Sequence, residues 1–295
     1  MTDQTFVPAP PKLRIRKAPR KILRTTRPVN EILDRPDING ISFQNKLIEL
    51  KLAGKNSSIS AKIFRESISN LARRTTGSTF GINPKHLLHA LDAQQIEDYA
   101  TEVYGVDLTK NKVSIDPELC EIAIDEAAEI LLDASTKGAK IIFASSRPGA
   151  TLPLMGRLAL LAQEYGATIL ESFTNTSRTI VDGRRDRNLT WSDKVAVVSD
   201  ETTKSLLGTN DTKIGDDIFF HLPRPDLVVA DHVFAASALT SGYKTIALAS
   251  LDSLALAVAS LDESKTLSVP LDLSRPSSHY EIINEYFENF FEIQS

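Results

Sequence analysis

The stretch Lys-Ile-Ile-Phe-Ala-Ser-Ser-Arg-Pro-Gly-Ala-Thr, residues 140 to 151, decides the fold. After Lys140 comes an uncharged apolar run, and small, hydroxylated and turn-forming residues follow it directly. A run that is apolar throughout is typical of a strand covered on both faces, as in a parallel sheet. A segment of helical character follows at residues 152 to 165. This order of strand, tight turn and helix predicts the start of a βαβ unit.

The same alternation of strand and helix continues to the end of the chain. Further apolar runs lie at residues 168 to 173, 194 to 198, 227 to 230, 245 to 249 and 267 to 269, and helix-length segments lie at 233 to 241, 254 to 260 and 280 to 290. Residues 139 to 295 are therefore predicted to form a Rossmann-like α/β domain with a mostly parallel sheet. Ligands of such sheets bind outside the carboxyl ends of the strands.

Residues 41 to 138 have helical periodicity instead, which predicts a helical region before the α/β domain. Apolar residues recur at helical spacing in residues 41 to 52, 58 to 71 and 87 to 96. Asp116-Pro117-Glu118 has the composition of a helix start with proline in the first turn. The helix that begins there is expected to end near Gly138.

Residues 1 to 40 form a basic arm rich in proline, with eight lysines and arginines between Lys12 and Arg27. This composition predicts disorder. Such an arm can contact nucleic acid or an acidic partner through counterion release. It can equally be a solvated tail with no specific partner, since the whole chain carries a net charge of -4.

Composition also indicates where the protein works. Cys120 is the only cysteine of the 295 residues, so an intramolecular disulfide and a thiolate zinc cluster are excluded. No apolar run approaches the roughly 20 residues of a membrane span, and the N-terminus lacks the apolar core of a signal peptide. We therefore predict a cytoplasmic protein without a membrane partner. Its oligomeric state is left open by the sequence.

The turn after the first strand of the α/β domain is a candidate phosphate site. Its main-chain amides and hydroxyls can surround an anion at a helix start, and a guanidinium can add a charge-assisted bond. The candidate phosphate-binding residues are Ser145, Ser146, Arg147, Gly149 and Thr151. An ordinary turn with Thr151 as the helix N-cap explains the same residues.

A second candidate site follows the strand Leu-Val-Val-Ala at residues 227 to 230, where Asp231 and His232 stand side by side. The carboxylate suits Mg²⁺ or Mn²⁺, and the imidazole suits proton transfer. Asp272 follows a later strand and is the second candidate metal ligand. Asp252 also follows a strand, but helix capping explains it at least as well. A structural explanation fits equally well, with Asp231 as a helix cap and His232 as a hydrogen-bonded residue at the rim of the sheet.

Several mechanisms lack their motifs. Neither G-x-G-x-x-G nor G-x-x-x-x-G-K-[ST] follows a strand, so no nucleotide cofactor is predicted. The nucleophile elbow G-x-S-x-G and the zinc motif H-E-x-x-H are missing as well. Cys120 has Glu126 where a cysteine phosphatase has arginine.

Taken in order, these segments resemble a family of actinobacterial phosphatases. The resemblance spans residues 43 to 290 and includes residues 145 to 149, the strand end at Asp231-His232 and Val-Pro-Leu-Asp at residues 269 to 272. It implies a hydrolase on an α/β fold. The sequence departs from the family pattern at Arg147-Pro148-Gly149-Ala150, where a His-Pro-Gly-Gly loop is expected, and at residues 201 to 207, where histidines are expected.

The turn at residues 145 to 151 is also similar to the phosphosugar-binding turn of sugar-isomerase (SIS) domains, and this similarity covers one loop only. We predict hydrolysis of a small phosphomonoester, with the turn holding phosphate, Asp231 and Asp272 holding a divalent ion, and Asp231 and His232 as the catalytic pair. The alternative is a phosphosugar-binding or regulatory module without catalysis.

Overall fold

The structure is a computed structural model, and it describes residues 42–55, 58–75, 77–82, 92–172, 180–181, 186–262 and 265–294. The predicted arm at residues 1 to 40 lies outside the described residues. Pro36–Ser295 form one compact unit.

The strands of the main sheet are β3 (Lys140–Ala144), β4 (Thr168–Ile169), β5 (Ile180–Val181), β6 (Asp186–Ser192), β7 (Val195–Asp200), β8 (Leu206–Leu207), β9 (Leu227–Asp231), β10 (Thr245–Ala249) and β11 (Thr266–Pro270). Their order is β11, β10, β9, β3, β7, β6, β5, with β4 also beside β3 and β8 beside β7. Neighbours from β11 to β7 pair in parallel, while β5, β6 and β8 pair antiparallel. The predicted mostly parallel α/β fold is confirmed.

Burial explains why the central strands were recognisable and why others were missed. Every residue of β7, β9 and β10 is buried, as expected for strands covered on both faces. β4 is shorter than predicted because β7 occupies the same flank of β3 from Phe143 onward. β6 was not predicted because polar residues alternate with its apolar ones. A turn with positive φ at Asp193 and Lys194 joins β6 to β7.

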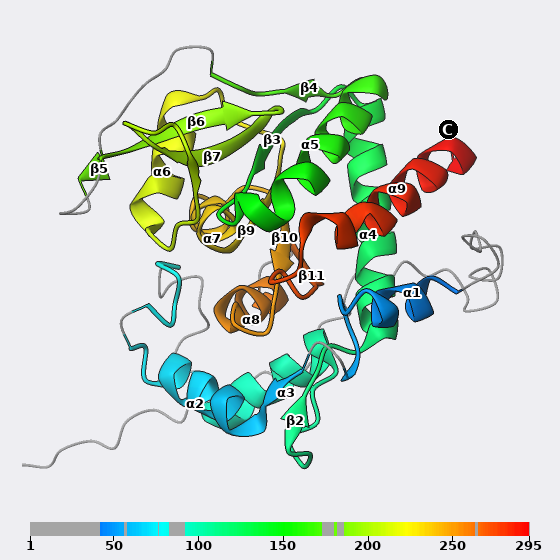
Figure 1. The fold of residues 1–295 in the computed structure, drawn as a ribbon, viewed down its shortest axis with the longest axis vertical. Coiled ribbons are helices and arrows are strands. Elements are labelled where there is room, and N and C mark those ends of the chain that lie inside the picture. The colour runs from blue at the N-terminus through cyan, green and yellow to red at the C-terminus, as the bar shows by residue number, and fades with distance from the viewer. Residues whose placement is uncertain are drawn as a thin grey trace, which may run out of the picture. The chain divides into compact units, whose positions relative to one another are not determined.

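Helices cover both faces of this sheet (Figure 1). They are α4 (Pro117–Thr136), α5 (Pro148–Glu164), α6 (Thr212–His221), α7 (His232–Thr240), α8 (Leu254–Asp262) and α9 (Glu281–Gln294), with a short 3-10 helix η3 (Ser277–Tyr280) before α9. Residues of α4, α5 and α9 enclose an apolar cavity of about 20 Å³ against β9, β10 and β11. α7 and α8 pack on the opposite face, and α6 packs on α7.

The region before α4 adds α1 (Phe43–Glu49), α2 (Ala61–Ala72), α3 (Ala93–Tyr104) and a two-residue ribbon of β1 (Ile59–Ser60) with β2 (Lys112–Val113). α4 begins as predicted: Pro117 is in its first turn, and the Asp116 carboxylate accepts a hydrogen bond from the Glu118 amide at 2.8 Å. α1 packs on α4, whereas α2 and α3 pack on α8. Residues 87 to 91 of the predicted third helical segment lie outside the described residues. Among the helices that the structure describes, none combines the length and apolar character needed to cross a bilayer.

The strand order places a topological switch between β3 and β9. α5 leads from β3 toward β4 on one face, whereas α7 and α8 lead from β9 to β10 and β11 on the other. Connections therefore diverge at the carboxyl ends of β3 and β9, which is where open α/β sheets bind ligands.

Candidate active site

Three turns meet at the carboxyl ends of β3, β9 and β10. Ala144 pairs with Ala230, and Leu248 pairs with Asp231, so the turn after β3 and the turn after β10 flank the Asp231-His232 pair. α5, α7 and α8 begin at these turns, so the positive ends of their dipoles lie at this edge of the sheet. The structure thus brings the predicted phosphate-binding turn next to Asp231 and His232.

Asp231 is fully buried and accepts hydrogen bonds from the turn after β3 and from the first helical residues behind it. The Ser146 amide donates to Oδ1 at 2.5 Å, and the Thr151 hydroxyl donates to Oδ2 at 2.7 Å. The Ser145 hydroxyl lies 3.3 Å from Oδ2. Asp231 stands at the N-cap of α7 but makes no capping bond. Its carboxylate therefore links β9 to the turn after β3.

The candidate phosphate-binding turn is shorter than predicted, because α5 already begins at Pro148. Thr151 is consequently a residue of the helix and not its N-cap. The amides of Ala150 and Thr151 both donate to the Arg147 carbonyl, at 2.9 and 3.0 Å, and the Arg147 amide donates to the Ser145 hydroxyl. Gly149 faces open space. Within this described turn, the guanidinium of Arg147 is the charged group that reaches outward, and its side chain is 29% exposed.

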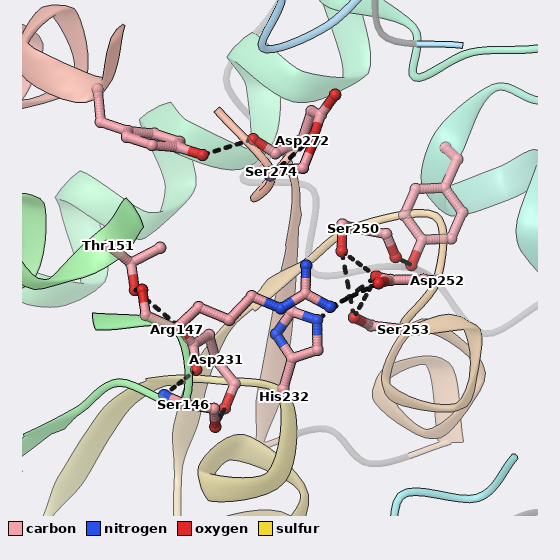
Figure 2. Close-up of polar contacts among 12 residues, drawn as sticks. Ser146, Arg147, Thr151, Asp231, His232, Ser250, Asp252, Ser253, Asp272 and Ser274 are labelled. Atoms are coloured by element: carbon pink, nitrogen blue, oxygen red, sulfur yellow. Dashed lines mark hydrogen bonds and ion pairs between the residues drawn. The ribbon is translucent and has the colours of Figure 1, made fainter. Parts of the chain in front are cut away.

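Arg147 and His232 meet at one carboxylate, that of Asp252 in the turn between β10 and α8 (Figure 2). Nη2 of Arg147 lies 2.5 Å from Oδ2, and Nε2 of His232 lies 3.4 Å from Oδ1. The Ser250 and Ser253 hydroxyls also bond Oδ1. Asp252 makes contacts with side chains and no helix-capping bond among the described residues. The sequence had favoured helix capping as the role of Asp252, and the structure shows side-chain contacts instead.

The charge of Asp252 is strongly favoured by these neighbours. Burial by itself would raise the pKa of Asp252, but His232, Arg147 and the Ser250 hydroxyl together hold it well below its ordinary value of 3.8. The side chain is nevertheless 55% exposed. Asp252 is therefore ionised at neutral pH, and it lies at the solvent edge of the site.

His232 combines burial with backbone strain. It is fully buried, and neither ring nitrogen has a hydrogen-bond partner. Its φ of 39° lies in the left-handed region, which is costly for a residue with a side chain. The ring of Phe80 packs edge-on against the imidazole with centroids 5.9 Å apart. A buried imidazole at a strained strand end, with a 3.4 Å contact to Asp252 but no hydrogen bond, is unusual in a structural role.

Asp272 does not join this centre. Its carboxylate accepts bonds from Arg275 at 2.7 and 3.0 Å and from the amide and hydroxyl of Ser274. Figure 2 shows it apart from Asp231. Both oxygens of Asp231 already accept bonds from donors, and no cluster of three metal-ligating side chains occurs within the described ranges. Asp231 and Asp272 thus do not fit a shared Mg²⁺ or Mn²⁺ in this arrangement.

Tyr104, from α3, contributes to the site and was not recognised in the sequence. Its fully buried hydroxyl donates to the Ser250 carbonyl at 2.9 Å, across 146 residues of the chain. Phe80 belongs to the same helical region. Nothing in the local sequence of either aromatic residue distinguishes it from an ordinary core residue.

Comparison with known proteins gives a family match over most of the chain. The model of the family described as Phosphatase matches residues 40–292. The chain belongs to the Phosphatase family. This family member is also similar to Phosphatase SCO2771 of Streptomyces coelicolor, with 30% identity over 185 residues. The match covers 60% of this chain and 64% of the Streptomyces protein, so it spans less than two thirds of that relative.

Proposed function

We propose that this member of the Phosphatase family hydrolyses small phosphomonoesters at the junction of Arg147, His232 and Asp252. The observation that carries the proposal is that a guanidinium and an imidazole contact one carboxylate at the topological switch of the sheet. A guanidinium suits phosphate oxygens, and an imidazole suits proton transfer. The name of the Streptomyces relative supports the same reaction class.

In the proposed reaction, the phosphate oxygens replace Asp252 on the Arg147 guanidinium. Water attacks phosphorus while the bond to the ester oxygen breaks, and the protonated imidazole of His232 gives its proton to the leaving oxygen. The dihydrogen phosphate that forms returns a proton to the imidazole, so the enzyme is regenerated. Asp252 stays charged and orients the ring, as the carboxylate of a catalytic triad does.

Asp231 has a different part in this proposal. Because its oxygens bond Ser146 and Thr151, it holds the turn that carries Arg147. It therefore acts on the geometry of the site and does not touch the substrate. The sequence suggested Mg²⁺ or Mn²⁺, so the test below compares activity with and without these ions.

The second candidate function is binding of a phosphosugar without hydrolysis. The observation that favours it is the complete burial of His232, because a catalytic group must reach its substrate. Under this alternative, Arg147 still holds the phosphate, and the imidazole only fills space behind Phe80.

Hydrolysis of a phosphomonoester panel, including p-nitrophenyl phosphate and sugar phosphates, tests the proposal. Wild type, R147Q and H232Q are compared in EDTA and in Mg²⁺ or Mn²⁺. We expect H232Q to lower kcat by at least about 10²-fold, the usual contribution of acid–base catalysis. R147Q is expected to raise KM, because it removes the cation that binds phosphate.

R157Q is the matched control, since Arg157 forms an ion pair of the same 2.5 Å length with Glu288 away from the site. It should leave turnover unchanged. Turnover that persists in H232Q contradicts the proposed role of the imidazole. An inactive wild type whose melting temperature rises with a sugar phosphate, but not in R147Q, supports the binding module instead.

A further inference from the structure

The turn that carries Asp252 is held from the other region of the molecule. Tyr104 is the last residue of α3, and its hydroxyl donates to the Ser250 carbonyl at 2.9 Å. The Ser250 hydroxyl in turn bonds Asp252. A chain of contacts therefore runs from α3 to the carboxylate between Arg147 and His232.

The Tyr104 hydroxyl is a constant donor. Burial, reinforced by the negative charge of Asp252, raises the pKa of Tyr104 well above its ordinary value of 10.0. The phenol consequently keeps its proton at neutral pH, and its hydroxyl can donate there.

We propose that Tyr104 is a positioning residue: through the Ser250 carbonyl it fixes the turn that holds Asp252 between Arg147 and His232. This inference rests on the proposed function of that centre and assigns a part in it to the helical region. Tyr104 touches neither substrate nor the reacting atoms, and it acts through Asp252.

The variant Y104F removes only the hydroxyl. Phenylalanine fills the same volume, and the Ser250 carbonyl keeps its bond from the Ser253 amide at 2.8 Å, so no buried group is left unpaired. We expect kcat to fall about tenfold, because a misplaced catalytic group costs up to about 10²-fold. KM should change by less than about twofold, since Arg147 is retained.

Y286F is the matched control. Tyr286 is also a buried tyrosine whose hydroxyl donates at 2.8 Å, but its acceptor is Asp125 on α4. It should lower the melting temperature as Y104F does and leave kcat unchanged. In the D252N background, Y104F should add less than about a twofold loss, because both changes act through one group.

A readout that needs no turnover separates this inference from the proposed function. In protein labelled with ¹⁵N-histidine, H232Q identifies the imidazole signals of His232. We expect those signals to shift in Y104F and in D252N in the same direction, and to stay in place in Y286F. An unmoved His232 signal in Y104F overturns the positioning role whether or not the protein is active. A shifted signal with an inactive wild type supports the positioning and rejects the hydrolysis.

Discussion

Asp231 ends β9 and Asp252 follows the neighbouring strand β10, yet they contact different kinds of group. Asp231 is buried among an amide and two hydroxyls, whereas Asp252 lies at the surface between an arginine and a histidine. Because the donors to Asp231 lie in and next to the turn after β3, this carboxylate has a structural role. A guanidinium and an imidazole that reach across the strand ends make Asp252 part of a site. Residue type alone therefore does not assign a role to either carboxylate.

Replacing Asp231 by asparagine is expected to destabilise the fold. In the wild type, the Thr151 hydroxyl donates to the Asp231 carboxylate. In D231N this hydroxyl faces the new amide nitrogen instead, so the bond from Thr151 to a buried carboxylate is lost. The cost should be about 2 kcal/mol, as for other bonds to buried carboxylates. Urea unfolding of D231N gives the value.

The control for D231N is D226N at the opposite end of β9. Asp226 is exposed and accepts one amide bond, from Lys140 at 2.8 Å, which an asparagine oxygen can also accept. Its stability should change by less than about 0.5 kcal/mol, as for most surface substitutions. A D231N protein as stable as D226N contradicts the structural role of Asp231.

At the scale of elements, α4 is the helix that serves both regions of the chain. It packs against α1 on one side and against β11, α5 and α9 on the other. Its sequence carries a run of acidic residues along with the apolar ones. Part of its surface is consequently both acidic and partly buried, and this makes its stability depend on pH.

Glu126 on α4 provides the pH test. Burial, with the nearby charges of Glu129 and Asp125, raises the pKa of Glu126 from 4.5 to about 6. A raised folded-state pKa means that the stabilising contribution is complete below 4.5 and is lost as pH rises through about 6. At about pH 8, E126Q should therefore be more stable than wild type by about 1 to 2 kcal/mol, at about 1.4 kcal/mol per pKa unit.

The gain from E126Q should disappear at about pH 4, where the wild-type side chain is protonated in both states. Denaturant unfolding at both pH values measures the difference. E102Q, at an exposed position of α3, is the comparison variant and should behave alike at the two pH values. An equal gain for E126Q at both pH values would falsify the pKa-based explanation.

For the whole molecule, the question is whether the helical region and the sheet unfold together. Residues of α2 and α3 pack on α8, and α4 packs on β11, so the two regions share contacts along their length. The chain offers one natural probe in each region: Cys120 on α4 and Trp191 on β6 are its only cysteine and tryptophan.

Thiol labelling of Cys120 should report global unfolding. The side chain is fully buried, and burial, with Glu121 and Asp116, raises the pKa of its thiol. Native protein should react at least about 10³-fold more slowly than unfolded protein, because reaction requires opening of the core. The urea midpoint from labelling should coincide with that from Trp191 fluorescence, as for one cooperative unit. Earlier exposure of Cys120 would show that the predicted boundary near residue 139 separates two units that unfold independently.

Local pattern was sufficient for much of the fold. The apolar run of β3 coincides with the observed strand, and Asp116 and Pro117 begin α4 as their residue types predict. β6 was missed because its apolar residues alternate with polar ones. The start of α5 was placed four residues late, because proline and glycine read equally well as a turn and as a first helical turn.

The sequence by itself determined the alternation of strands and helices, the end of the sheet at which a site can form, and the presence there of Arg147, Asp231 and His232. Only the tertiary structure decided that Arg147 meets Asp252 across 105 residues and that Tyr104 reaches Ser250 across 146. The physical reason is the distance along the chain over which each kind of interaction acts. Strand and helix follow from hydrophobic spacing within a few residues, whereas the partner of a charge depends on which strand ends the topology makes neighbours.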